Sequence, residues 1–155
     1  MSCVARAGHG ATLHFVNTVN HSGKSTALAP ALSAAETTCI CLLDDNLSLL
    51  KALDRLLKSD GFNVEKYREP AAFLSAVGKS PCRVAILDVW MPDMNGLEVQ
   101  SVLRNDSPET RIIFISGRAD PSVRQTALES GAFGFLSKPF DDEVFLQLVR
   151  TAVAA

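Results

Sequence analysis

Residues 39–46 read CICLLDDN, an uninterrupted apolar run that ends on two adjacent carboxylates, Asp44 and Asp45. A short run with no polar position is typical of a strand that is buried on both faces. Neighbouring anions repel each other, so the two carboxylates need either full hydration or a shared cation. The stretch therefore predicts a buried strand that ends in a polar site, and the partners of the acidic pair must come from elsewhere in the chain.

From Thr37 onward, apolar runs alternate with helical patterns in five successive units. This alternation predicts an α/β domain over residues 37–155, with a parallel sheet covered by helices. The run FNVEKY is mixed enough for an edge strand, whereas RVAILD is apolar enough for a central one. The expected strands are residues 38–43, 62–67, 83–88, 111–116 and 132–138. The helices between and after them are marked by starts or ends at Gly61, Pro70, Asn95 or Gly96, Pro121, Gly131 and the pair Asp141–Asp142.

Composition excludes several classes of function. The chain has 155 residues, of which 47% are hydrophobic, and this is enough for one domain with a sizeable core. A formal charge of −2, with no block of basic residues, gives no footprint for direct nucleic-acid binding. No apolar run approaches the length that spans a membrane. We therefore expect a cytoplasmic protein with no membrane contact.

Four cysteines, at positions 3, 39, 41 and 82, raise the question of disulfides or a metal site. Cys39 and Cys41 lie two apart in an apolar run, where a strand would point both to one face. We interpret them as reduced thiols in the core. The chain shows no Cys/His spacing typical of zinc, so the sequence predicts no zinc site.

Residues 1–36 differ from the rest of the chain, because they contain all three histidines and only one acidic residue, Glu36. They show no clear periodicity, and we expect a disordered leader that folding does not require. The segment HSGKST, residues 21–26, ends like a phosphate-binding P-loop. The glycine that this motif needs five residues before Gly23 is replaced by Thr18, so we do not assign a P-loop.

Polar residues stand at the expected carboxyl ends of four strands: Asp44 and Asp45, Asp88, Ser116 and Lys138. Parallel strands bring these ends to one edge of the sheet, where ligands bind. Three clustered carboxylates suit a hard divalent cation with oxygen ligands, which indicates Mg²⁺. A cation beside a lysine and a nucleophilic carboxylate is an arrangement for phosphoryl transfer.

The motifs LLDDN, ILDVWMPDMNG, FISG and FGFLSKPF, taken in this order, resemble the receiver domain of two-component response regulators across residues 38–155. The ending KPFDDE is similar to the FixJ-like branch in particular. The resemblance implies a flavodoxin-like (βα)5 fold with five parallel strands in the order 2-1-3-4-5. It also implies a phosphoprotein of phosphorelay signal transduction rather than an enzyme, with only self-catalysed phosphorylation and slow autodephosphorylation.

The family's roles are expected where the residues match. Asp88 would accept a phosphoryl group, as an aspartyl phosphate, from a sensor histidine kinase or a histidine phosphotransfer protein. Asp45 would bind Mg²⁺ directly and Asp44 mostly through water, with Asp88 and the backbone carbonyl of Trp90 as further ligands. Lys138 would pair with the acyl phosphate.

Three further expectations follow from the resemblance. The peptide bond between Lys138 and Pro139 would be cis. Ser116 would swing toward the phosphoryl oxygens, and Phe135 would follow into the vacated space. Family members often carry Tyr at that position, so any signal that needs a hydroxyl is lost here while the packing switch remains.

The segment after Lys138 is long enough for one helix only, whereas most FixJ-like relatives continue into a helix-turn-helix output domain. We therefore expect a single-domain regulator without an output domain, which signals by protein contact. The expected contact, with a downstream target or in a homodimer, uses the face of helix four, strand five and helix five, where Arg124 and Phe140 lie.

Two other readings remain open. The chain could be a degenerate receiver that acts as a phosphorylation-independent interaction module, although such a module needs none of Asp45, Asp88 and Lys138. It could also be a Mg²⁺-dependent aspartyl-phosphate phosphatase of the haloacid-dehalogenase type. That family has a second Asp two residues after the nucleophile, where this chain has Trp90.

Overall fold

The computed structural model describes residues 4–7, 11–14, 38–118 and 120–155, and the chain divides into two compact units, Met1–Thr37 and Thr38–Ala155. In the first unit, strands β1 (Val4–Ala7) and β2 (Ala11–His14) form an antiparallel hairpin. The sequence predicts no strand in this segment, so the hairpin is a feature that only the structure shows. Most of the expected leader, with HSGKST and the other two histidines, lies outside the described residues.

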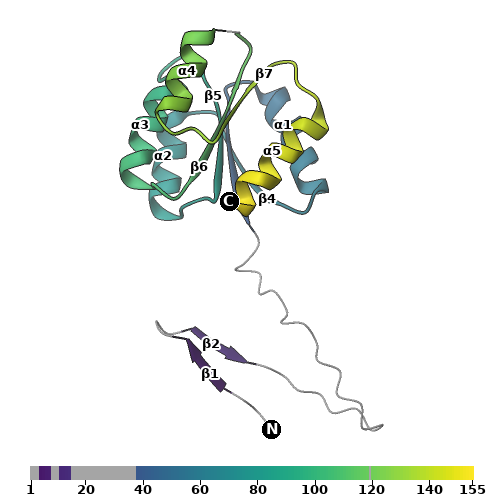
Figure 1. Ribbon diagram of the computed structural model, residues 1–155, viewed down its shortest axis with the longest axis vertical. Helices are drawn as coiled ribbons and strands as arrows, with labels where there is room; N and C mark the ends of the chain where they lie inside the picture. Colours follow the sequence, from purple (N-terminus) through teal and green to yellow (C-terminus); the bar gives the residue numbers. More distant parts are fainter. Residues whose placement is uncertain (1–3, 8–10, 15–37, 119) are drawn as a thin grey trace. The chain divides into compact units, whose positions relative to one another are not determined.

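The second unit is a five-stranded parallel sheet with five helices, as the alternation of apolar runs predicts (Figure 1). The strand order is β4-β3-β5-β6-β7, which is 2-1-3-4-5 within this unit and confirms the predicted topology. The strands are β3 (Cys39–Leu43), β4 (Asn63–Tyr67), β5 (Val84–Asp88), β6 (Arg111–Ser116) and β7 (Gly134–Ser137). The helices are α1 (Leu47–Ser59), α2 (Pro70–Lys79), α3 (Gly96–Asp106), α4 (Pro121–Glu129) and α5 (Asp142–Ala154).

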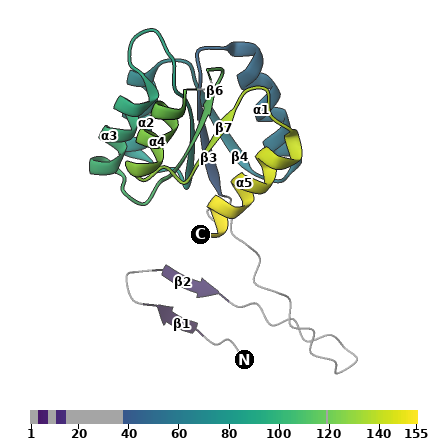
Figure 2. The same ribbon diagram turned by 45° about the horizontal axis from the view of Figure 1, so that its top comes forward.

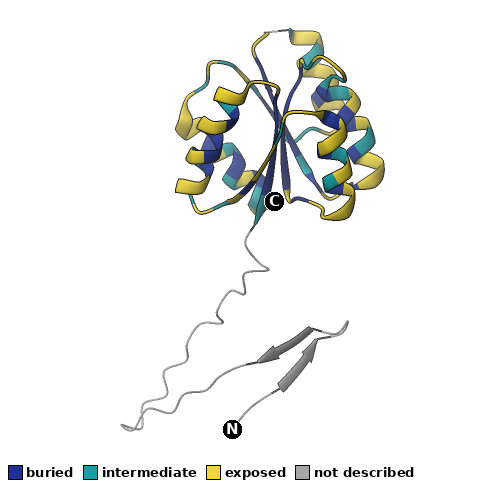
Figure 3. Cartoon of the chain, turned by 180° about the vertical axis from the view of Figure 1, so that it is seen from behind, coloured by how far each residue is buried: buried dark blue, intermediate teal, exposed yellow. Residues whose placement is uncertain are grey.

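The helices form a layer on each side of the sheet, with α1 and α5 on one face and α2, α3 and α4 on the other (Figures 1 and 2). Alternate residues of β3 point to opposite layers: Ile40 and Leu42 join the core under α1 and α5, while Cys41 and Leu43 join the other core. All five residues of β5 are buried, as expected for the central strand. The strands are dark throughout the middle of Figure 3, and the outward faces of the helices are exposed.

Local signals explain where the helices begin and end. Asn46 caps α1 by accepting a hydrogen bond from the Leu49 N–H at 3.2 Å, and Asn95 forms a capping box with Glu98 at the start of α3. Gly61, with φ of 91°, follows α1 in a left-handed conformation that glycine adopts without strain. Gly61 and Asn95 are positions at which the sequence predicts a helix boundary, whereas the Asn46 cap was not predicted. None of the helices in the described part of the chain combines the length and apolar character needed to cross a bilayer.

Candidate functional site

The three carboxylates predicted to cluster do lie together. Asp44 and Asp45 directly follow β3, Asp88 ends β5, and one carboxylate oxygen from each lies within 4.8 Å of the others. Asp44 and Asp88 are only 1% and 5% exposed, whereas Asp45 is exposed. The Asn46 N–H donates a 2.8 Å hydrogen bond to Asp44 Oδ1, which fixes that side chain. The cluster therefore has two buried anions and one that faces solvent.

Lys138, which follows β7, supplies the ammonium of the cluster. Its Nζ lies 2.9 Å from Asp44 Oδ2 and 3.2 Å from Asp88 Oδ1, so one cation bridges both buried carboxylates. Its own N–H donates to the carbonyl oxygen of Ser116 at 2.7 Å, which ties the loop to the end of β6. The Lys138–Pro139 peptide bond is cis, as expected.

Electrostatics at the cluster show that its charges are unbalanced. Burial and the charge of Asp44 raise the pKa of Asp88 to about 6, against the lowering effect of Lys138. Burial by itself would lower the pKa of Lys138, but its ion pairs with Asp44 and Asp88 outweigh burial and raise that pKa. The ammonium is therefore held charged, and it does not fully compensate the carboxylates.

The excess of negative charge at the cluster allows us to ask whether these residues could bind Mg²⁺. A cation with oxygen ligands would find three carboxylate oxygens at one opening, and it would relieve the repulsion that raises the pKa of Asp88. The donor set contains no sulfur or imidazole, which is the chemistry expected of a hard ion. The cluster therefore fits Mg²⁺.

Ser116 ends β6 and is fully buried. Its hydroxyl points toward the backbone of Arg118 rather than toward the carboxylates. Ser116 Oγ donates to the Arg118 carbonyl oxygen at 3.1 Å and accepts from the Arg118 N–H at 3.2 Å. A hydrogen bond from Ser116 to a group on Asp88 would require the side chain to rotate away from both of these partners.

Phe135 on β7 is 6% exposed, so its ring already lies inside the protein while Ser116 is turned toward Arg118. Its centroid lies 6.2 Å from that of Phe114, and the guanidinium of Arg124 covers it at 5.7 Å. The expected inward movement of Phe135 stays a prediction. The structure adds that such a movement would begin from a buried ring.

Two exposed side chains flank the cluster. Trp90, in the loop after β5, is 39% exposed, and the guanidinium of Arg118 lies 5.0 Å from the centroid of its ring. This is the distance of a cation–π contact. The contact joins the loops that follow β5 and β6. Trp90 lies two residues after Asp88, and Arg118 lies two residues after Ser116.

The sequence analysis treated Gly96 only as a helix start, and the structure gives it a second role. A Cβ at this position would collide with the carbonyl oxygen of Asp88 and lie 2.9 Å from the ring of Phe114. Helix α3 can therefore approach the strand that carries Asp88 only because residue 96 has no side chain. The sequence did contain a signal for this role. Asn95 caps the helix by itself, so capping does not explain why the next residue is glycine.

Phe140 differs from its expected place on the α4–β7–α5 face. Its ring stacks on Phe145 with centroids 5.3 Å apart, and it lines a cavity of about 590 Å³ together with Leu49 and Leu53 of α1. Arg124, by contrast, is on α4 as expected, and Leu128 and Val144 add exposed apolar surface to α4 and α5.

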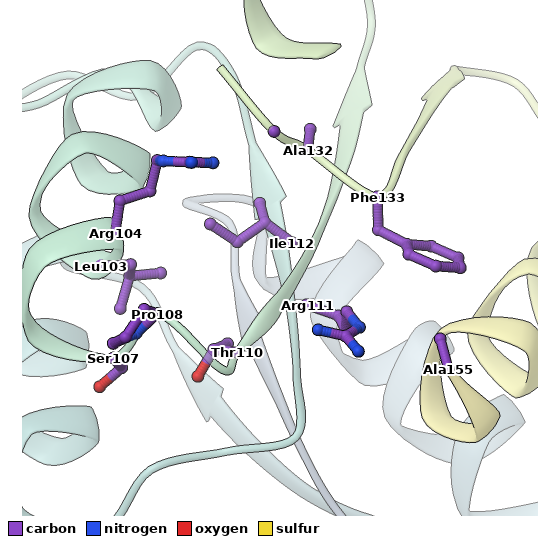
Figure 4. Close-up of a pocket in the computed structure, with 11 residues that line it drawn as sticks. Leu103, Arg104, Ser107, Pro108, Thr110, Arg111, Ile112, Ala132, Phe133 and Ala155 are labelled. Atoms are coloured by element: carbon purple, nitrogen blue, oxygen red, sulfur yellow. The ribbon is translucent and has the colours of Figure 1, made fainter. Parts of the chain in front are cut away.

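A cavity of about 500 Å³ lies at the opposite edge of the sheet, by the amino ends of β6 and β7 (Figure 4). Arg104 and Arg111 are its charged lining residues, and Phe133 closes one side. It contains none of the acidic residues, Ser116 or Lys138. This cavity is therefore separate from the chemistry at the carboxyl ends of the strands.

Comparisons with known proteins agree with this geometry. Residues 40–150 match the family described as response regulator receiver domain. Response regulator protein TodT of Pseudomonas putida is 41% identical over 74% of this chain and 50% of its own length. Transcriptional regulatory protein FixJ of Bradyrhizobium diazoefficiens is 29% identical over 74% of this chain and 56% of its own length. The chain thus spans about half the length of the curated relatives it matches.

Among solved structures, the chemotaxis protein CheY4 of Vibrio cholerae is similar, with a TM-score of 0.70 and 28% identity. The match covers 75% of this chain and 98% of that one. The family match lies within the second unit, and the first unit lies outside the residues that it covers.

Proposed function

Because the chain belongs to the response regulator receiver domain family, we propose that Asp88 accepts a phosphoryl group from the phosphohistidine of a sensor histidine kinase or a histidine phosphotransfer protein. The observation that carries this proposal is the contact of Lys138 Nζ with both buried carboxylates, at 2.9 and 3.2 Å. Lysine, Asp44 and Asp88 come from three different strand ends, and a structural ion pair would not need the third carboxylate at Asp45.

The residues have distinct tasks in this transfer. Lys138 contacts Oδ1 of Asp88, which leaves Oδ2 as the oxygen that attacks phosphorus. An O–P bond forms there and the P–N bond to the donor imidazole breaks. The imidazole, which already carries a proton on its other ring nitrogen, leaves as the neutral ring. The ammonium of Lys138 stabilises the charge that gathers on the phosphoryl oxygens, because burial weakens the competing hydration.

Asp44, Asp45, Asp88 and the backbone carbonyl of Trp90 are the proposed ligands of Mg²⁺. When bound, the ion neutralises the equatorial oxygens of the transferring group. After transfer, Ser116 is proposed to leave the backbone of Arg118 and to hydrogen-bond the new phosphoryl group. Phe135 then repacks against the space beside it. This pair is the proposed switch.

Output is proposed to occur by protein contact through the α4–β7–α5 face, either with a target or with a second copy. Leu128 and Val144 are 39% and 54% exposed there, and apolar surface of this kind suits a protein partner better than water. A cytoplasmic location, and no direct nucleic-acid binding by this domain, are part of the same proposal.

The test is radiolabel transfer from a phosphorylated histidine kinase or a small acyl phosphate donor. The parent should become labelled in Mg²⁺ but not when a chelator is present. Asp88→Asn should not become labelled at all. Asp93→Asn is the matched control, since it removes the same charge from an exposed residue of the same loop. Full labelling of Asp88→Asn at an acid-stable site would reject the proposal, and turnover of a small phosphate ester would favour the phosphatase instead.

A further inference from the structure

A second group of metal-ligating side chains lies where β3 pairs with β4. Figure 2 shows these two strands next to each other. The Cys39 and Cys41 sulfurs and a Glu65 carboxylate oxygen all lie within 4.8 Å of one another. Cys41 and Glu65 are register partners on the parallel strands, so both project from the same face. Nothing in phosphoryl transfer uses these residues.

The surroundings of this group are ordered as a ligand site requires. The Tyr67 hydroxyl donates a 2.6 Å hydrogen bond to Glu65 Oε2, which orients the carboxylate and leaves its other oxygen free. The Cys82 side chain belongs to the same core cluster as Cys41, and the two are 3% and 1% exposed. Such outer partners hold metal ligands in place in many proteins.

We propose that Cys39, Cys41 and Glu65 form a binding site for a thiophilic divalent cation, Zn²⁺, with Tyr67 and Cys82 as positioning residues. Two sulfurs select a borderline or soft ion over Mg²⁺, and a carboxylate completes ligand sets that Zn²⁺ accepts. Half-buried Cys39 and exposed Glu65 give the ion a route from solvent. The fourth position is open to water.

The distances permit closure around the ion. Ligand atoms of a tetrahedral site lie roughly 3.5–4 Å apart, given Zn–S bonds of about 2.3 Å. A separation of at most 4.8 Å therefore needs a change of at most roughly 1 Å, which small side-chain rotations at half-buried Cys39 and exposed Glu65 can supply. The spacing of Cys and His residues along the chain did not predict this site. Its third ligand, Glu65, comes from the neighbouring strand and is brought to the cysteines only by the pairing of β3 with β4.

The experiment is a Co²⁺ titration of the full chain followed by displacement with Zn²⁺, in a buffer with saturating Mg²⁺ and a reductant that is not a thiol. Every protein in the series carries Cys3→Ser, so that the remaining thiols are Cys39, Cys41 and Cys82, all of which belong to the proposed site. The readout is the sulfur-to-metal charge-transfer band in the near ultraviolet, which the carboxylates around Asp88 cannot produce. The parent should show the band and saturate with one equivalent of metal.

The variants separate the ligands from a general surface effect. Cys39→Ser should reduce the band per bound ion and weaken binding by at least about 10-fold, because even outer partners commonly contribute about 10–100-fold. Glu65→Gln should weaken binding similarly while the band per bound ion is retained. Tyr67→Phe should lower affinity without changing the band. Glu69→Gln is the matched control, since it removes a carboxylate from a nearby exposed position and should bind as the parent does.

Absence of the charge-transfer band, or equal affinity in the parent, Cys39→Ser and Glu65→Gln, would overturn the proposal. The proposal is also overturned if the protein carries no metal after the titration but has lost two free thiols. The cysteines would then be a redox pair and not metal ligands. Melting of each variant without metal checks folding, and Glu65→Gln tests the site at an exposed position where loss of fold is not expected.

Discussion

Replacing Asp88 by Asn should stabilise the protein in the absence of divalent cations. Burial and the nearby charge of Asp44 raise the pKa of Asp88 from an ordinary 3.8 to about 6. Between these two pH values, the folded protein keeps a proton that the unfolded chain has released. The free energy of unfolding therefore falls as the pH rises through this window, and the loss is complete above about pH 6.

The size of the effect follows from the same two values. One pKa step corresponds to about 1.4 kcal/mol, so charging Asp88 costs the folded state about 3 kcal/mol. The amide of Asn carries no such cost, although it also loses the attraction to Lys138. We expect Asp88→Asn to raise the free energy of unfolding at pH 7.5 by about 1–3 kcal/mol, which for a domain of this size is roughly 3–12 °C in Tm.

Denaturant unfolding of the parent and Asp88→Asn between pH 4 and pH 8, in chelator, measures this difference directly. Titrating groups that do not interact with Asp88 cancel in the comparison. Asp93→Asn should follow the parent within about 0.5 kcal/mol at each pH, because that carboxylate is exposed. Adding Mg²⁺ should then stabilise the parent and leave Asp88→Asn nearly unchanged. The reasoning is refuted if the variant is no more stable than the parent at pH 7.5, or if a gain persists undiminished at pH 4.

Three further outcomes are expected. A chain that starts at Thr37 should melt cooperatively within a few degrees of the full chain, and a larger loss of Tm would show that residues 1–36 pack on the domain. Trp90→Asn should accelerate loss of phosphate without a kinase by about 10-fold, or about 1.4 kcal/mol of barrier, since the ring under Arg118 shields the approach of water; equal decay rates would instead make Trp90 part of a partner surface. Gly96→Ala should lower the free energy of unfolding by about 1–3 kcal/mol through overpacking. Gly78→Ala, on an open helix surface, should raise it by about 0.5–1 kcal/mol. Calorimetry that shows a change of the same sign for both variants would contradict this account.

The fold was predictable because its signals are local and repeated. Each buried strand is an apolar run of a few residues, and helix boundaries coincide with caps and punctuating residues such as Asn46, Gly61 and Pro70. Parallel pairing then fixes which ends of the strands meet. This is why Asp44, Asp88 and Lys138 could be placed at one site before their distances were known.

Side-chain orientation was not predictable in the same way. The sequence places Ser116 at the strand end, but only the tertiary contact with the Arg118 backbone decides where its hydroxyl points. Phe140 follows the strand that was expected to form a partner face, yet its ring stacks on Phe145 inside the neighbouring layer. These choices depend on packing between segments distant in sequence, which local patterns do not contain.

The charge balance of the site connects these orientations to signalling. Three carboxylates and one ammonium leave an excess of negative charge that a divalent cation can neutralise. Conversion of the Asp88 carboxylate into an acyl phosphate would add further negative charge, which a hydrogen-bond donor at the end of β6 would partly offset. Ser116 can answer only by giving up both hydrogen bonds to the Arg118 backbone. We predict that the loop of Arg118, whose guanidinium lies over the Trp90 ring, would thereby lose both of these hydrogen bonds, and that a change of charge at Asp88 would in this way alter the exposed surface.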